Sequence, residues 1–352
     1  MDKNVHYDKR NCYAYISVLK EFKEQPYSLI MDANTAINLG KFYYKPYALV
    51  DTNKKDNDSN RNKEWLSTME LLIDIQDKDP VFGFALQETC WDYDKKCINE
   101  IQYSKMEHAL KSEYLWNTSE IIRNAYSLGH TNNFNVNRKK VNKIETLLDQ
   151  MECNPLMLGS YACILKMLLL QKKINNIGRE HCYIEFIEFM RKDIRIIHSI
   201  EANIAACYFL GKDETKEMSE KILKFGKKGS MLLNAWNACW DIFYLRLLQN
   251  DSEVGVNTHN TVLLTKDEGL IILAKMVTLE AKIIDSDGYI NVNSFKGVNI
   301  RDEYKELIDK VHKDLYFDVI EHFIEGNNSN KKYKHLEELV YNLEQQVLKE
   351  YN

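Results

Sequence analysis

The chain is 352 residues long, which allows two domains or one core domain with a large insertion. Hydrophobic residues make up 45% and charged residues 28%, an ordinary globular balance, and the formal net charge of −5 excludes a surface that is basic all over. No apolar run is long enough to span a bilayer, and no apolar segment follows the basic residues near the start. We therefore expect a soluble, cytoplasmic protein with no membrane partner.

The eight cysteines are typical of a reducing compartment. They form no C-x-x-C pair, and Cys163, Cys207 and Cys239 lie inside apolar helical patterns, as free thiols packed in a core do. His181-Cys182 resembles a ligand pair, but no second pair at a suitable spacing accompanies it. We expect neither a zinc site nor disulfides.

The first predicted elements lead to an aspartate. Residues 13–23 have apolar positions about one turn apart and predict a short helix. Tyr27–Met31 is a continuous apolar run that predicts a buried parallel strand ending on Asp32. A helix is expected to start at Asn34 and Thr35 and to continue to residue 44.

Polar loops and helices follow. Residues 51–63 are rich in Asn, Asp and Lys, so we expect a mobile surface loop. A helix is predicted at Glu64–Gln76, and Asp79-Pro80 interrupts the chain before a second helix, which contains Glu88. The next residues are almost wholly helical in pattern, with helices expected at 102–127, 139–151, 156–171, 180–209 and 213–226.

The last third returns to the pattern of strand, aspartate and helix. A strong helix is expected at 231–249 and a polar loop at 251–260. Thr261–Leu264 predicts a second buried strand, which ends Thr265-Lys266-Asp267. A helix is predicted at 268–280, followed at 281–299 by a strand or hairpin that turns at Ser286-Asp287-Gly288. Two final helices are predicted at 301–325 and 331–351.

Four acids fit one chemistry. Asp32 and Asp267 each stand where a strand gives way to a helix, the edge at which open parallel sheets place catalytic groups. Asp241 lies in the helix before the second strand, and Glu88 lies in a helix that can return to the same edge. Hydrolysis of a phosphodiester needs hard cations, and Mg²⁺ and Mn²⁺ prefer oxygen ligands. We predict that the four carboxylates converge on such a metal.

The residues around these acids resemble the motifs of PIN-domain nucleases. The segment LIMDAN at 29–34 looks like the opening of that family, and ALQE at 85–88 looks like its early helical glutamate. WDIFYL at 240–245 and LLTKD at 263–267 resemble its third and fourth acidic motifs. The resemblance covers about residues 1–95 and 231–285. It implies an α/β fold: a three-layer PIN-like core with a mostly parallel sheet, plus a large all-helical insertion and C-terminal helices.

Each acid also has a plainer interpretation. An aspartate at the end of a strand is often only a helix N-cap, and a helical glutamate is most often exposed. Three other glutamates are alternatives to Glu88, namely Glu100, Glu107 and Glu185. Asn34 and Thr265 are further candidates to hydrogen-bond an acid or the substrate, with capping as the alternative, and Asn237 lies one turn before Asp241.

The resemblance implies a metal-dependent endoribonuclease that uses Mg²⁺ or Mn²⁺, with RNA favoured over DNA. The alternatives are a DNA or flap-type nuclease on the same core and a non-catalytic interaction protein with a degenerate core. The expected organisation is a first part of the core at 1–97, a helical insertion at 98–228, the second part at 229–300 and C-terminal helices at 301–352. The insertion is a candidate surface for a protein partner or homo-oligomer.

Basic residues gather in three places despite the negative total. They are Arg138, Lys139, Lys140 and Lys143, then Arg191, Lys192 and Arg195, then Lys221, Lys224, Lys227 and Lys228. Such runs are usually solvated helix faces, but a local stripe is enough to contact phosphates. We expect Lys221–Lys228 to border the substrate cleft. Tyr43, Tyr44 and Tyr47 are candidates to stack on bases, with packing as the alternative.

Overall fold

The computed structural model describes residues 5–10, 12–17, 28–49, 63–127, 149, 154–195, 197–249, 261–285, 288–324 and 333–351. The chain divides into two compact units. Unit 1 is Met1–Leu147 with Asn250–Asp267, and unit 2 is Leu148–Gln249 with Glu268–Asn352. These boundaries differ from those expected at 97/98 and 228/229, because the helices just after residue 98 pack with unit 1 and the helix at 231–249 packs with unit 2.

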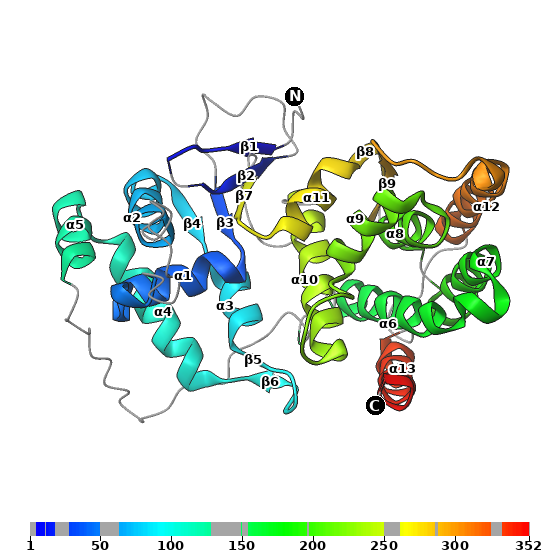
Figure 1. Ribbon diagram of the computed structural model, residues 1–352, viewed down its shortest axis with the longest axis horizontal. Helices are drawn as coiled ribbons and strands as arrows, with labels where there is room; N and C mark the ends of the chain where they lie inside the picture. The colour runs from blue at the N-terminus through cyan, green and yellow to red at the C-terminus, as the bar shows by residue number, and fades with distance from the viewer. Residues whose placement is uncertain are drawn as a thin grey trace. The chain divides into compact units, whose positions relative to one another are not determined.

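Unit 1 is built on a five-stranded mixed sheet of order β1-β2-β7-β3-β4 (Figure 1). β3 is parallel to both of its neighbours, whereas β2 is antiparallel to β7 and to β1. The central strands are buried on both faces, as their continuous apolar sequences predict. The strands are β1 (Val5–Tyr7), β2 (Ala14–Ser17), β3 (Ser28–Met31), β4 (Asp79–Val81) and β7 (Thr261–Thr265).

Two of these strands correct the sequence analysis. The helix expected at 13–23 is wrong where the structure describes it, because Ala14–Ser17 forms β2, and residues 18–23 lie outside the described part. Aromatic and β-branched residues such as Tyr15 and Ile16 favour a strand between two neighbours. Pro80 lies within β4, at the edge of the sheet, where a residue without an N–H is tolerated.

The helices of unit 1 pack against one face of the sheet. Their apolar side chains form a core with the alternate strand residues Leu29, Met31, Val262 and Leu264. A two-stranded hairpin, β5 (Trp91–Asp92) with β6 (Cys97–Ile98), lies apart from this sheet. The helices are α1 (Ala33–Tyr44), a 3-10 turn (Pro46–Leu49), α2 (Lys63–Ile75), α3 (Gly83–Cys90), α4 (Glu100–Tyr114) and α5 (Thr118–Tyr126).

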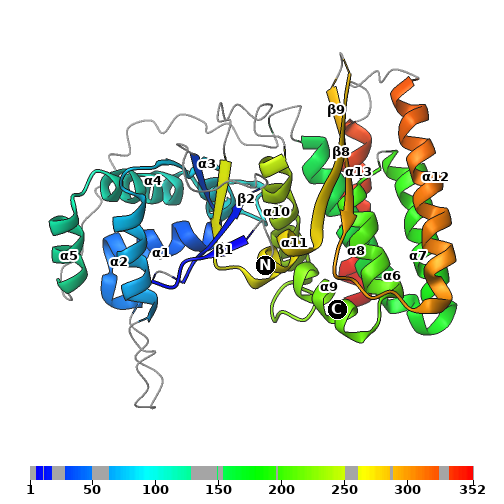
Figure 2. The same cartoon turned by 90° about the horizontal axis from the view of Figure 1, so that it is seen from above.

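Unit 2 is mostly helical. Its long central helix α6 packs against α7, α10 and α13 (Figure 2). A hairpin of β8 and β9 packs against α8. The elements are α6 (Asn154–Ile177), α7 (Arg179–Phe189), a π-helical turn (Met190–Ile194), α8 (Ser199–Leu210), α9 (Asp213–Leu223), α10 (Met231–Gln249), α11 (Glu268–Met276), β8 (Val277–Asp285), β9 (Gly288–Phe295), a 3-10 turn (Asp302–Tyr304), α12 (Lys305–Ile324) and α13 (Tyr333–Tyr351).

The expected helix at 268–280 is wrong in its last turn. α11 ends at Met276, and Val277 begins β8 by pairing with Phe295. β-branched Val277 and Thr278 favour this strand, and the pairing with β9 supplies the backbone hydrogen bonds that a longer helix would have made. The predicted hairpin is present, although Ser286 and Asp287 of its turn lie outside the described residues.

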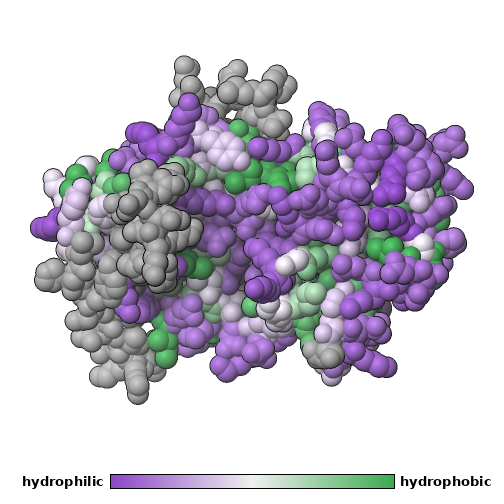
Figure 3. All heavy atoms as spheres, in the orientation of Figure 1, coloured by the Kyte–Doolittle hydropathy of each residue, from purple (hydrophilic) through white to green (hydrophobic). Residues whose placement is uncertain are grey.

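Most of the face shown in Figure 3 is hydrophilic, with apolar side chains scattered in small groups. No helix among the described residues is long and apolar enough to cross a membrane. The loops expected at 51–63 and 251–260 and the helix expected at 139–151 fall almost entirely outside the described residues, as does the basic group at 138–143.

Candidate functional site at the ends of β3 and β7

Asp32 joins the end of β3 to the start of α1. Its Oδ1 accepts a hydrogen bond of 2.7 Å from the backbone N–H of Thr35. Asp32 is therefore the N-cap of α1, as the plainer interpretation predicts. Its own N–H donates to the carbonyl of Leu264 on the neighbouring strand at 3.2 Å. The first junction is therefore fixed against the second.

Thr265 connects the two junctions through its side chain. The hydroxyl donates to Oδ2 of Asp32 at 2.5 Å and accepts from the backbone N–H of Asp267 at 2.9 Å. The prediction that Thr265 hydrogen-bonds an acid is confirmed by its bond to Asp32. β3 has β4, the next of these strands in the chain, on one side and β7, a much later strand, on the other. Parallel sheets commonly bind ligands at the point where the strand order reverses in this way.

Burial makes the charge of Asp32 costly. The residue is 3% exposed, and desolvation raises the pKa of its carboxyl above the ordinary value. The hydrogen bonds from Thr265 and Thr35 oppose this effect, while the nearby charge of Asp267 raises the pKa further. Within the described residues no cationic side chain pairs with Asp32. Among the described residues, the charge of Asp32 is therefore balanced by hydrogen bonds and not by an ion pair.

Lys266 stands between Thr265 and Asp267 but faces a different set of partners. Its ammonium group lies 3.1 Å from Oε1 of Glu64 and donates to the hydroxyl of Ser67 at 2.7 Å. It also lies 4.1 Å from the centre of the Tyr13 ring. These contacts occupy the ammonium group, so Lys266 does not serve as the counter-ion of Asp32.

Glu88 does not complete a metal-binding cluster. It lies on α3, which packs against α1 and β3, and it is partly buried. Across the described ranges there is no group of three or more His, Cys, Asp or Glu side chains placed to hold a metal ion. Glu88, Asp32 and Asp267 form no such group in this structure, and the predicted role of Glu88 as a ligand stays a prediction.

The two junction acids still suit a hard cation. Mg²⁺ is usually bound by one or two carboxylates, with waters and substrate phosphates as the other ligands. Asp32 and Asp267 supply carboxylate oxygens of the right kind, and a cation bound there would favour the charged form of the buried Asp32 carboxyl. Asn34, in the first turn of α1, is exposed beside this site, where a substrate group can reach its amide.

Asp241 belongs to unit 2 and has a cation of its own. Its carboxylate lies 2.8 Å from Nζ of Lys224, and both side chains are 6% exposed. Asn237 meets the same ammonium group through its backbone carbonyl, at 3.4 Å, rather than through its side chain. Lys221 pairs with Glu268 at 2.8 Å. Two members of the Lys221–Lys228 cluster are thus engaged by carboxylates, and its expected place beside a cleft stays a prediction.

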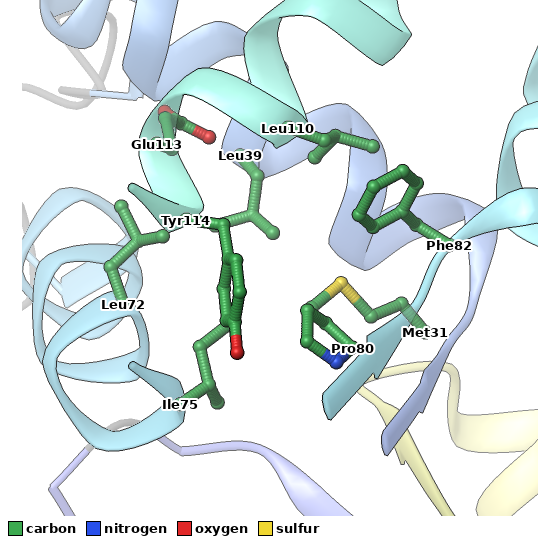
Figure 4. Close-up of a pocket in the computed structure, with 9 residues that line it drawn as sticks. All are labelled: Met31, Leu39, Leu72, Ile75, Pro80, Phe82, Leu110, Glu113 and Tyr114. Atoms are coloured by element: carbon green, nitrogen blue, oxygen red, sulfur yellow. The ribbon is translucent and has the colours of Figure 1, made fainter. Parts of the chain in front are cut away.

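Sequence reasoning missed a buried acid in α4. Glu113 is 1% exposed, neither of its carboxylate oxygens has a hydrogen-bond partner within the described residues, and burial raises its pKa well above the ordinary value. It borders an apolar cavity of about 10 Å³, room for about one water molecule (Figure 4). The periodicity of α4 alone does not show that this position faces inward, because its neighbours are mostly polar.

A polar network inside unit 2 was also missed. Arg246 lies 2.6 Å from Oε2 of Glu201, donates to Nδ1 of His198 at 3.1 Å, and donates to the hydroxyl of Ser160. Burial lowers the pKa of His198 to about 4. Burial alone would raise the pKa of Glu201, but the charge of Arg246, together with smaller contributions from His198 and from hydrogen bonds, outweighs burial and lowers that pKa. The network joins α6, α8 and α10 inside unit 2.

The third missed feature is a basic pocket on unit 1. It has a volume of about 500 Å³ and is bordered by three lysines, Lys41, Lys45 and Lys105. The signal was weak, because Lys105 is more than fifty residues away from the other two in sequence. Comparison of the chain with known proteins finds no matching family, no matching curated protein and no matching solved structure.

Proposed function

We propose that this protein is a PIN-like, metal-dependent endoribonuclease whose active site is built on Asp32 and Asp267. The observation that carries the proposal is the hydrogen-bonded link from Asp32 through Thr265 to the backbone of Asp267, across two adjacent parallel strands. Two acids that the sequence motifs single out, 235 residues apart in the chain, share one edge of the sheet. The three-layer PIN-like core belongs to the same proposal.

Each residue has a distinct task at this edge. Asp32 and Asp267 would hold a Mg²⁺ or Mn²⁺ ion, which would supply Lewis-acid activation of the phosphate and of the attacking water. Thr265 fixes the orientation of the Asp32 carboxylate, and the N-cap bond from Thr35 fixes its other oxygen, so the carboxylate is preorganised. Asn34 donates a hydrogen bond to the substrate strand. Glu88 and Asp241 stay candidates whose contribution mutagenesis decides.

The direct test replaces each junction acid by its neutral isostere. Asp32→Asn and Asp267→Asn remove ligand charge while keeping shape, so Mn²⁺-dependent RNA cleavage should fall at least about 100-fold. Asp77→Asn is the matched control, because Asp77 is exposed on the same unit. The melting temperature of Asp32→Asn should not fall, since the neutral amide avoids the burial of a charge. Normal cleavage by both variants would contradict the proposal.

The choice of RNA rests on the family resemblance. A side-by-side digest of single-stranded RNA, single-stranded DNA and branched DNA separates an endoribonuclease from a DNA or flap-type nuclease. RNA should be cut fastest. Faster cleavage of branched DNA would leave the proposed active site in place but would overturn RNA as the substrate.

One observation favours a second candidate, a non-catalytic interaction protein on a degenerate core. The carboxylate of Asp241 is neutralised by Lys224, and no three-acid group exists among the described residues. Calorimetric titration with Mn²⁺ separates the two candidates. A nuclease should bind Mn²⁺ and lose that binding in Asp32→Asn, whereas a degenerate core should bind none. Asp241→Asn, measured alongside, reports whether that acid takes part.

A further inference from the structure

A basic pocket lies between α1, α3 and α4 on unit 1, three helices that pack together (Figure 1). Its volume of about 500 Å³ suits a small organic group. Lys41 borders it from α1, Lys45 from the residue just after α1, and Lys105 from α4, and all three are exposed. Within the described residues none of the three ammonium groups forms an ion pair with a carboxylate.

The floor of the pocket is apolar and closely packed. A Cβ atom at Gly40 would lie 2.7 Å from the sulfur of Met106, so glycine allows α1 and α4 to approach at this point. Tyr44 donates its hydroxyl to the carbonyl of Lys105 at 2.9 Å, and the ammonium of Lys105 lies 4.7 Å from the centre of the Tyr44 ring. These two contacts with Tyr44 place the Lys105 ammonium group at the border of the pocket.

The lysines continue a stripe that begins at the candidate active site. Asn34 and Lys41 are exposed, and their spacing of seven residues places them on one face of α1, while the exposed Lys45 follows the last residue of the helix. Lys41 lies about 13 Å along the helix axis from Asp32, at 1.5 Å per residue. Phosphates of a stacked strand follow one another about every 3.4 Å, so a strand cut at Asp32 reaches Lys41 within about four nucleotides.

We infer that this pocket binds a nucleotide of the substrate strand about four positions from the cut, its phosphates on Lys41, Lys45 and Lys105 and its base on the apolar floor. The combination of three lysines with an apolar floor fits a nucleoside phosphate better than a bare anion, which needs no floor, or a neutral ligand, which needs no lysines. The inference rests on the proposed function for the identity of the strand.

The test measures binding apart from cleavage. Lys41, Lys45 and Lys105 are changed together to Glu in the full chain, in an Asp267→Asn background and in EDTA. Fluorescence anisotropy then follows a labelled single-stranded RNA of about 12 nucleotides. The triple variant should bind at least about tenfold more weakly at about 50 mM NaCl, and its slope of log Kd against log salt should fall by about 2, since each phosphate contact on a single strand contributes about 0.7.

A matched control makes the same change of net charge elsewhere. Lys310, Lys313 and Lys349 are exposed lysines of unit 2, and their replacement by Glu should leave the salt slope nearly unchanged. Equal losses in the two triple variants would overturn the pocket and indicate a general charge effect. Circular dichroism of both variants verifies folding, and Lys41→Gln with Lys45→Gln is the milder pair to use where a reversed triple does not fold.

Two further outcomes separate this inference from the proposed function. Adenosine 5′-monophosphate is titrated as a competitor, and displacement of the RNA at equal concentration would overturn the assignment to a strand in favour of a free nucleotide. Normal RNA binding by the lysine variant overturns the inference, whatever the cleavage assays give. Lost binding by that variant supports the pocket even where Asp32→Asn and Asp267→Asn cleave normally, which would remove the proposed active site alone.

Discussion

The buried carboxylates of the two units differ in whether a cationic side chain lies against them. In unit 2, Glu201 is fully buried and meets Arg246, and Asp241 meets Lys224. In unit 1, Asp32 and Glu113 are at most 3% exposed, and the structure describes no cation against either. The pKa of Glu201 is lowered, whereas those of Asp32 and Glu113 are raised, Glu113 by burial alone.

The difference indicates which acids are structural and which are available. A buried acid that meets a buried cation is satisfied within the fold, and breaking the pair is expensive. A buried acid without a cation costs stability and is retained where something else binds to it, or where a chain merely tolerates it. Asp32 stands at a strand end beside a second acid, and Glu113 faces an apolar cavity. Only the first location belongs to the proposed active site.

The strongest way to break this comparison is to remove a cation from unit 2. Arg246→Met should leave Glu201 buried without its partner and lower the free energy of unfolding by about 3–5 kcal/mol. Hydrogen exchange of the α6, α8 and α10 amides locates the loss in unit 2. The double variant Arg246→Met with Glu201→Gln should recover much of it, since no charge is then stranded. A small effect of the single change would show that the network is not structural.

The pH dependence of unit 2 should follow His198. Its pKa of about 4 in the folded chain lies below the ordinary value of about 6.5, so the unfolded chain binds a proton first as pH falls. Stability is therefore present above about pH 6.5 and lost down to about pH 4, by about 3 kcal/mol for this group. Urea unfolding across that range measures the slope. His198→Gln should flatten it, and His181→Gln, at an exposed histidine, should not.

The smallest expected effect sharpens the comparison from the side of unit 1. Glu113→Leu replaces an unsatisfied buried carboxyl with an apolar side chain and should stabilise the protein by about 2 kcal/mol near neutral pH. The gain should shrink near pH 4, because the raised folded pKa costs stability only where the unfolded carboxyl is ionised. Glu113→Gln should recover only the pH-dependent part. Destabilisation by Leu would mean that Glu113 has a partner.

The sequence was sufficient for the strands that carry the candidate acids. Tyr27–Met31 and Thr261–Leu264 are continuous apolar runs with an abrupt polar end, and β3 and β7 follow them closely. The predicted helix at 13–23 failed because a strand buried on both sides has no alternation, and its short apolar run is then ambiguous between helix and strand. Backbone pairing with β7 on one side and with β1 on the other stabilises the strand conformation of β2.

The candidate site was predictable in part for the same reason. Junction acids can be read from a local pattern, and Asp32 and Asp267 lie where such a pattern places them. The surroundings of Glu88, Lys105 and Glu113 depend on how their helices pack. Helical periodicity predicts which residues share a face of a helix, but not which element that face contacts. The Lys224–Asp241 pair depends on the end of α9, where Lys224 adopts a left-handed backbone conformation that no local motif announces.

The position of β7 has a consequence for how the protein is made. β2 and β3 emerge from the ribosome early, but the strand that separates them is synthesised more than 200 residues later. At about 5–20 residues per second, the two early strands wait on the order of ten seconds or more with unpaired edges. Those edges are open to wrong partners in that interval. A chain that stops before Thr261 therefore has an unfinished sheet and lacks both Thr265 and Asp267.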